Sequence, residues 1–201
     1  LWRIIDILMK EHNVNKAVDF TRNFINDMVK EKFSLNKLII TKSLREFYKN
    51  PKQIAHKVLA DRIGKREPGN KPSPGSRIPF VYIQTKGKPK LQGDRIEDPK
   101  YIIKHGLKPD FTHYITNQIQ KPVQQIYCLV LDQIKEFKPM KKSFDRKIRG
   151  LSREFKDDEK KLDDKITKEK EKVVYELIFK DGINKAKNIS KNHAMKSFFN
   201  I

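Results

Sequence analysis

Residues 53–69 read QIAHKVLADRIGKREPG, and the apolar side chains in this segment recur at the spacing of one helical face. Ile54, Val58 and Leu59 lie on that face, which predicts a helix that packs against a core. Pro51 precedes the segment, and proline is typical of a first helical turn. The sequence therefore predicts a helix from Pro51 to about Ile63.

Two short apolar segments flank this helix and predict a small strand pair. LIIT at 38–41 and IPFVYI at 78–83 are rich in β-branched and aromatic residues and are bounded by polar residues. Pro79 predicts either that the second strand lies at a sheet edge or that the proline stands at the start of the strand. Residues 67–77 hold three prolines and two glycines, which predicts an irregular loop before this strand.

Further helices are expected on both sides of this region, so the predicted class is α+β and mainly α-helical. Apolar periodicity predicts a helix pair at 2–9 and 15–32. Helices are also expected from Asp98 to a stop at Gly106, from a cap at Asp110 to Gln120, and from Pro122 to Ile134.

The composition shifts after residue 137, which predicts one domain at 1–137 and an extension. A basic, irregular linker is expected at 138–149. A charged helix is expected at 150–181, because its sparse apolar residues repeat every 11 positions and Gly182 would end it. A flexible tail is expected at 182–201.

The composition excludes several protein classes. The 201 residues are 37% hydrophobic, and no apolar run approaches the roughly 20 residues of a membrane-spanning helix, so no membrane partner is expected. Cys128 is the only cysteine, which excludes a disulfide scaffold and a cysteine-rich zinc site. The chain opens at Leu1 within an apolar periodic segment, which predicts a fragment of a longer polypeptide.

The net charge predicts a polyanionic partner. Lys and Arg number 45 against 25 Asp and Glu, a formal charge of +20. Residues 1–137 carry +12 and residues 138–201 carry +8, and residues 41–77 alone hold 10 basic and 3 acidic side chains. Nucleic acid is the leading candidate. The alternative is that lysine merely makes the surface soluble.

The densest basic segment supplies the candidate nucleic-acid contacts. Its cations flank the apolar face of the predicted helix or lie on the adjoining Pro/Gly-rich loop, an arrangement that suits phosphate contacts along a duplex. The candidate DNA-binding residues are Lys42, Lys52, Gln53, His56, Lys57, Arg62, Lys65, Arg66, Lys71 and Arg77.

No catalytic or metal-binding residues are predicted. The sequence has no Asp-x-Asp pair, and the carboxylates at 157–159 and 163–164 sit amid lysines on a predicted solvated helix. The five histidines are scattered, and no glycine-rich phosphate loop with a following lysine occurs. The chain by itself is therefore expected to be inactive as an enzyme.

Several motifs in order resemble the C-terminal thumb of family B DNA polymerases, and the delta type is most similar. They are LIITKSL at 38–44, QIAHKVLADR at 53–62, KREPG at 65–69 and RIPFVYI at 77–83. EDP at 97–99, Asp110, YITNQ at 114–118 and KP at 121–122 continue the resemblance, which covers about residues 1–135.

The resemblance implies a part of a DNA-directed DNA polymerase whose magnesium-binding palm precedes Leu1. It assigns to this chain the grip on primer-template DNA, with the remainder of the polymerase as a further partner. Cellular delta-type enzymes carry two cysteine clusters after the thumb, which this chain lacks. The pattern is more like polymerases of large DNA viruses, so the expected location is a replication site in the host nucleus or a cytoplasmic virus factory.

The last residues resemble a sliding-clamp-binding peptide. In NHAMKSFF at 192–199, one helical turn would place Met195, Phe198 and Phe199 on one face, with Asn192 where the motif usually has Gln. The sequence thus predicts a clamp-tethered polymerase segment that grips DNA. A stand-alone basic nucleic-acid-binding or assembly protein, with the charged helix as an oligomerisation element, is the alternative.

Overall fold

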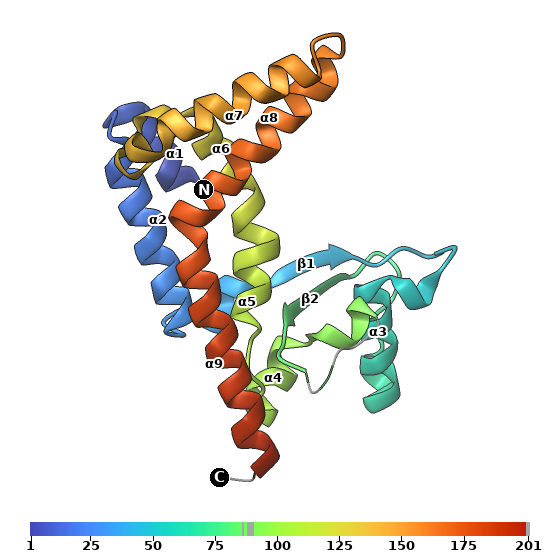
Figure 1. The fold of residues 1–201 in the computed structure, drawn as a ribbon. Coiled ribbons are helices and arrows are strands. Elements are labelled where there is room, and N and C mark those ends of the chain that lie inside the picture. Colours follow the sequence, from blue (N-terminus) through green and yellow to red (C-terminus); the bar gives the residue numbers. More distant parts are fainter. Residues whose placement is uncertain (86, 88–90, 200–201) are drawn as a thin grey trace. The chain divides into compact units, whose positions relative to one another are not determined.

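The computed structural model describes the backbone of residues 1–85, 87 and 91–199, and side chains within these ranges as far as residue 189. The chain divides into two compact units. Unit 1 consists of Leu1–Glu31 and Ile115–Ile189, and unit 2 consists of Lys32–Tyr114 and Ser190–Ile201. Helices dominate and one small sheet is present, which confirms the predicted α+β, mainly helical class (Figure 1).

Unit 2 contains a three-stranded antiparallel sheet in the order β1-β2-β3. The strands are β1 (Ile40–Ser43), β2 (Arg77–Tyr82) and β3 (Ile96–Glu97). The two predicted strands are confirmed as a pair, with Ile40 opposite Phe80 and Ser43 opposite Arg77. The first strand begins two residues later than predicted, because Leu38 ends a 3-10 helix. The third strand was missed, because two residues carry no alternating pattern.

Pro79 was predicted to lie in an edge strand or at a strand start. It lies within β2, the central strand of the sheet. It faces Thr41 of β1, whereas β3 pairs only with Val81 and Tyr82 at the far end of β2. Proline is tolerated here because β2 has one neighbour at this position, so one side needs no ladder donor.

Helix α3 (Ala55–Arg66) packs on this sheet and closes the core of unit 2. The predicted start at Pro51 is a separate 3-10 turn at Pro51–Gln53, because Ile54 adopts an extended conformation between the two. The buried core residues are Leu44, Leu59, Ala60, Ile78, Phe80 and Ile96. Of the residues predicted to face the core, Leu59 lies in it, whereas Val58 packs beside Gly93 and Ile54 precedes the helix.

The predicted start and end of one helix of unit 2 and the predicted cap of the next helix are confirmed. Asp98 accepts a hydrogen bond from the Tyr101 backbone N–H and caps α4 (Pro99–His105), which Gly106 ends at a φ of 61°. Asp110 accepts from the His113 N–H and caps the short helix α5 (Phe111–His113). A π-helix at Tyr114–Gln120 follows α5.

Unit 1 is built from helices around a buried apolar core. They are α1 (Trp2–Lys10), α2 (Val14–Val29), α6 (Lys121–Leu129), α7 (Lys141–Glu154), α8 (Glu159–Val174) and the first half of α9 (Lys180–Phe199). The hydroxyls of Thr21 on α2 and Tyr127 on α6 lie 2.7 Å apart within the core. Burial raises the pKa of Tyr127 to about 12, so its phenol stays protonated and hydrogen-bonded.

The region after residue 137 differs from its prediction. The expected irregular linker at 138–149 is largely helix α7, because Phe144, Ile148 and Leu151 form an apolar face among the charges. The expected single helix at 150–181 is divided by a break at residues 155–158, where Asp158 caps α8. The 11-residue repeat therefore spans two helices.

Gly182 does not end a helix. It lies buried inside α9, where a Cβ would overlap the side chain of Ile25, so the residue permits close helix packing. The backbone of the expected flexible tail at 182–201 is helical as far as Phe199. Its side chains from residue 190 onward lie outside the described residues.

Candidate nucleic-acid interface

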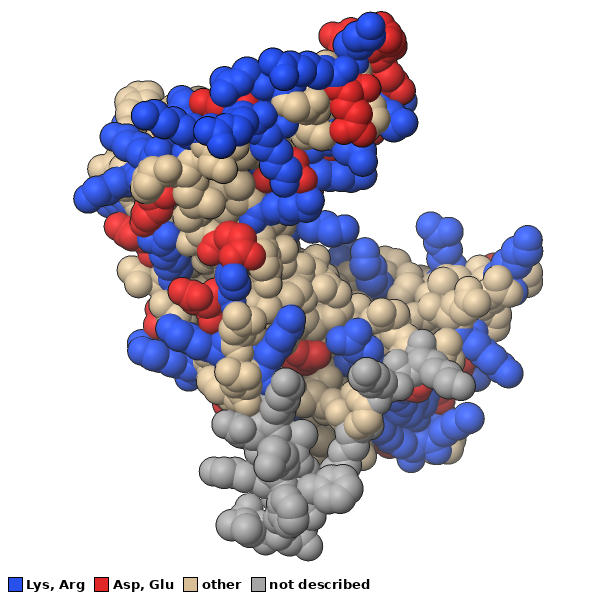
Figure 2. All heavy atoms as spheres, viewed as in Figure 1, with Lys and Arg blue, Asp and Glu red and all other residues tan. Residues whose placement is uncertain are grey.

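The residues predicted to contact DNA all lie in unit 2, on neighbouring segments. Lys42 lies on β1, Lys52 and Gln53 in the 3-10 turn, His56, Lys57, Arg62, Lys65 and Arg66 on α3, Lys71 in the loop after α3, and Arg77 at the start of β2. The loop returns to the end of β1, because Leu44 exchanges backbone hydrogen bonds with Ser76 and Gly75. Figure 2 shows Lys and Arg side chains on the surface of this unit.

Unit 2 carries a strong positive charge. Its main segment, Lys32–Tyr114, has 19 Lys and Arg against 7 Asp and Glu, a net charge of +12. The two segments of unit 1 together have 24 against 18, a net charge of +6. The candidate interface therefore lies on the more positive unit, although unit 2 is the smaller of the two.

Seven exposed cations of this region form no ion pair with a carboxylate in the described part of the chain, and we call them the basic patch. They are Lys42, Arg45, Lys49, Lys52, Lys65, Lys71 and Arg77. Arg77 donates to the hydroxyl of Thr41 at 2.9 Å, which leaves its charge uncompensated. Lys71 packs beside Gly64, so the loop brings it to α3. Five of these seven residues were predicted from the sequence.

Arg62 and Arg66 are engaged inside unit 2. Arg62 donates to the carbonyls of Ile96 and Gly93 at 3.0 and 2.6 Å and to Glu97 at 3.2 Å. Arg66 donates to the same Glu97 oxygen at 2.8 Å and stacks over the Tyr101 ring at 3.6 Å. These contacts fix α3 to β3, so both guanidinium groups serve the fold of the unit.

Glu97 holds this pair of arginines from a buried position, with its side chain only 4% exposed. Burial by itself would raise the pKa of Glu97. The hydrogen bonds from Arg66 and from the Asp98 backbone N–H, together with the charge of Arg62, outweigh burial and hold that pKa below its usual range. Glu97 is therefore ionised at neutral pH and neutralises part of the arginine charge.

Two other predicted residues have internal partners as well. Lys57 forms an ion pair with Asp61 one turn along α3 at 2.5 Å. His56 Nε2 lies 2.9 Å from the Tyr48 hydroxyl, and burial with the charges of Lys42 and Arg45 lowers the pKa of His56. His56 is neutral at pH 7 and acts as a support for Tyr48 rather than as a cation.

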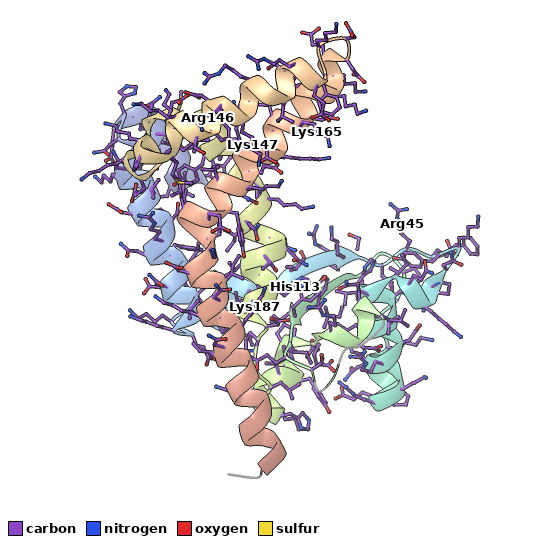
Figure 3. The ribbon with its side chains drawn as sticks, viewed as in Figure 1. Arg45, His113, Arg146, Lys147, Lys165 and Lys187 are labelled. Carbon is purple, nitrogen blue, oxygen red and sulfur yellow. The ribbon has the colours of Figure 1, made fainter. Side chains whose placement is uncertain are left out.

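Sequence reasoning missed the segment of residues 45–49, which connects β1 to the 3-10 turn. The Arg45 backbone N–H donates to the Tyr48 hydroxyl at 2.7 Å, and this bond, with His56, anchors the segment. Phe47 is 81% exposed between two cations of the patch. Figure 3 shows the Arg45 side chain extending away from the body of unit 2. The sequence feature that could have indicated this segment is the aromatic pair Phe47-Tyr48, which has Arg45 and Lys49 on either side.

The described residues offer no gathered catalytic constellation of the kind that metal-dependent chemistry requires. Among them, no three His, Cys, Asp or Glu side chains lie together as a metal-binding group. The acidic run at 157–159 is exposed, and Asp158 serves as the cap of α8. The resemblance places the magnesium ligands of a polymerase in its palm, which precedes Leu1.

The predicted clamp-binding residues Asn192, Met195, Phe198 and Phe199 have side chains that lie outside the described residues. Their backbone is part of α9. Elsewhere in the chain, no helix formed by described residues is long and apolar enough to cross a bilayer.

Comparison with known proteins places the chain in a family. Residues 2–130 match the sequence profile of DNA polymerase family B. The DNA polymerase of Pyramimonas orientalis virus is 39% identical over 98% of this chain, and that of Acanthamoeba polyphaga mimivirus is 44% identical over 64%. The DNA polymerase delta catalytic subunit of Candida albicans is 32% identical over 66%. The chain therefore belongs to DNA polymerase family B.

These relatives are far longer than the chain. It spans 17% of the Pyramimonas orientalis virus polymerase, 8% of the mimivirus polymerase and 12% of the Candida albicans subunit. The resemblance to viral and delta-type family B enzymes is confirmed. The profile match ends at residue 130, and of the three relatives only the Pyramimonas orientalis virus polymerase aligns over nearly all of the chain.

Proposed function

We propose that the chain is the C-terminal part of a replicative DNA-directed DNA polymerase and that unit 2 grips the primer-template duplex. The observation that carries this proposal is the basic patch, whose exposed cations have no carboxylate partners among the described residues. Family membership supports a polymerase over a stand-alone basic assembly protein. The catalytic palm and its magnesium ions would belong to another part of the polymerase, and the chain would act at the site of DNA replication, in a host nucleus or a virus factory.

The fold explains how such a grip would work. Helix α3 and the β1–β2 pair hold the patch segments in place, and the Glu97 ion pairs lock α3 to β3. The lysine and arginine side chains can then neutralise phosphates without an ordering step in the backbone beneath them. Phosphate contacts position a duplex and do not read its sequence. Such a grip would keep a polymerase on any template, which is what processive synthesis requires.

A direct titration tests the grip. The chain is expected to bind primer-template DNA of unrelated sequences with equal affinity, and log Kobs should fall with log salt at a slope of about −0.9 for each phosphate neutralised. Fluorescence anisotropy with a labelled duplex at several salt concentrations measures both quantities. Failure to bind, or an affinity that does not respond to salt, would contradict the proposal.

We also propose that the end of α9 tethers the polymerase to a sliding clamp. The support is the spacing of Met195, Phe198 and Phe199 in the sequence, which suits one helical turn inserted in an apolar pocket. In the complete polymerase, replacing both Phe198 and Phe199 with Ala is expected to abolish stimulation by the clamp while basal synthesis is retained. Primer-extension assays with and without the clamp measure this difference. If the clamp stimulated the double variant as strongly as the parent polymerase, the proposed tether would be wrong.

A further inference from the structure

Helix α7 of unit 1 presents four cations along one side. Lys142, Arg146, Arg149 and Arg153 follow one another at intervals of four, three and four residues, and all four are exposed. At 3.6 residues per turn they fall within about 60° of the helix circumference, which makes a narrow stripe about 16 Å long. We call it the α7 stripe. Figure 2 shows the blue side chains along α7, and Figure 3 labels Arg146 on this helix.

The other side of α7 is used by the fold. Phe144 packs edge-on against the buried Phe137, with ring centroids 5.4 Å apart. Lys147 forms an ion pair with Glu169 of α8 at 2.5 Å. These contacts orient α7 and leave the stripe facing solvent. Because its apolar face is covered, α7 lacks the exposed apolar side that a membrane-surface helix requires.

The acidic residue beside the stripe on α7 is Asp145, three residues from Lys142 and four from Arg149, and it can balance at most one of the four charges. None of the four stripe cations forms an ion pair or a hydrogen bond within the described part of the chain. Like charges three and four residues apart disfavour a helix. A nearby groove of about 1120 Å³ shows the contrast, because its lysines face Glu169, Glu171 and Glu176, and Lys147 and Lys172 both pair with Glu169. The α7 stripe, by contrast, forms no such pair with the carboxylates of the described residues.

Gly150 adds a second observation beside the stripe. It lies within α7, where glycine disfavours the helix relative to alanine. A Cβ at this position would meet no other atom, so internal packing does not explain the glycine. Because no side chain covers the helix backbone at Gly150, an extended ligand beside the stripe can approach the backbone there.

We propose that the α7 stripe is a second DNA-binding surface that contacts the phosphate backbone of the duplex. The proposal rests on the proposed polymerase function and concerns a segment beyond the family match, which ends at residue 130. Three of the four cations are arginines, whose planar guanidinium groups bind phosphate through two parallel hydrogen bonds. The stripe is straight and the phosphate backbone of the duplex is curved, so the four cations do not all reach phosphates together. Two or three of them contact phosphates at one time.

The test uses the full 201-residue chain with all four stripe residues replaced by Gln. A control variant replaces four exposed lysines dispersed over unit 1, which are Lys30, Lys160, Lys168 and Lys185. Both variants lose four positive charges, so a difference between them reports position rather than net charge. Circular dichroism establishes that both retain the helical content of the parent. Anisotropy titrations then compare duplex DNA with poly-glutamate as the alternative polyanion.

The stripe variant is expected to bind duplex DNA about tenfold more weakly than the control variant, with a salt slope reduced by about 2. Equal affinities of the two variants would overturn the stripe while leaving the proposed function intact. Absence of DNA binding by the parent chain would instead overturn the proposed function. Equally tight binding of poly-glutamate, lost in the same way in the stripe variant, would assign the stripe to an acidic protein and overturn the DNA proposal.

Discussion

Replacing Glu97 with Gln is expected to lower the free energy of unfolding of unit 2 by about 2 to 3 kcal/mol. The substitution keeps the shape of the side chain and removes the charge that Arg62 and Arg66 share. Breaking a buried ion pair by removing one partner costs about 3 to 5 kcal/mol, and the partial exposure of both guanidinium groups reduces that figure here. Urea unfolding of the full chain measures the change, and hydrogen exchange at the Leu59 amide assigns it to unit 2.

The ion pairs of Glu97 with Arg62 and Arg66 also predict how the free energy of unfolding depends on pH. The pKa of Glu97 in the folded chain lies below its value in the unfolded chain. Its contribution is therefore complete above the unfolded value of about 4.3 and is lost as pH falls through the lower folded pKa. The stability difference between the parent chain and the Glu97→Gln variant should accordingly shrink below about pH 4 and stay constant from pH 5 to 7.

Asp61→Asn is the matched control. It removes the carboxylate of the partly exposed ion pair between Lys57 and Asp61, which both lie on α3. Its expected effect is below about 1 kcal/mol, the usual range for a surface pair. Equal effects of the two substitutions would mean that Glu97 is not the lock between α3 and β3.

Neutralising three lysines of the basic patch is expected to weaken binding of primer-template DNA about a hundredfold in 0.1 M salt. The variant replaces Lys52, Lys65 and Lys71 with Gln, and the salt slope should fall by between about 2 and 3 because each lysine contacts about one phosphate. These side chains are exposed and have no ion pairs within the described residues, so the substitutions should leave the fold intact. Anisotropy titration over a range of salt measures both effects.

The control for this variant removes the same charge elsewhere in unit 2. Replacing the exposed Lys37, Lys100 and Lys104 with Gln is expected to change affinity less than fivefold, with the salt slope nearly unchanged. If both triple variants lost affinity equally, binding would follow net charge alone and the patch would have no special role. In the complete polymerase, the patch variant should shorten the product of each binding event and spare single-nucleotide addition on saturating DNA.

Local sequence patterns were sufficient for much of unit 2. The helix at Ala55–Arg66 and the strand pair were predicted from nearby residues, with the first strand placed two residues too early. The helix start at Asp98 and the cap at Asp110 were predicted in the same way. The strand at Ile96–Glu97 was missed because two residues carry no period, and its position depends on pairing with Val81 and Tyr82. Helix α7 was missed because its three apolar residues are diluted by charge.

The candidate site was predictable as a segment and less so residue by residue. The excess of Lys and Arg at 41–77 indicated the segment that holds all seven cations of the basic patch, and this segment lies within unit 2. Two of the predicted cations have a carboxylate partner in Glu97, which lies 31 and 35 positions from its arginines, so no local sequence pattern predicts the pairing. The segment at 45–49 was overlooked because its exposure depends on the Tyr48 anchor to Arg45 and His56, which only the folded chain displays.

If unit 2 contacts primer-template DNA through the basic patch, site-specific crosslinking will detect the contact at a chosen residue. A photoreactive phenylalanine analogue at the exposed Gln53 is compared with the same analogue at the exposed Met9 of unit 1. With primer-template DNA bound to the full chain, we expect an efficient crosslink from position 53 to the duplex portion and only background from position 9. Tight DNA binding with no crosslink from position 53 above that background would contradict the proposed contact.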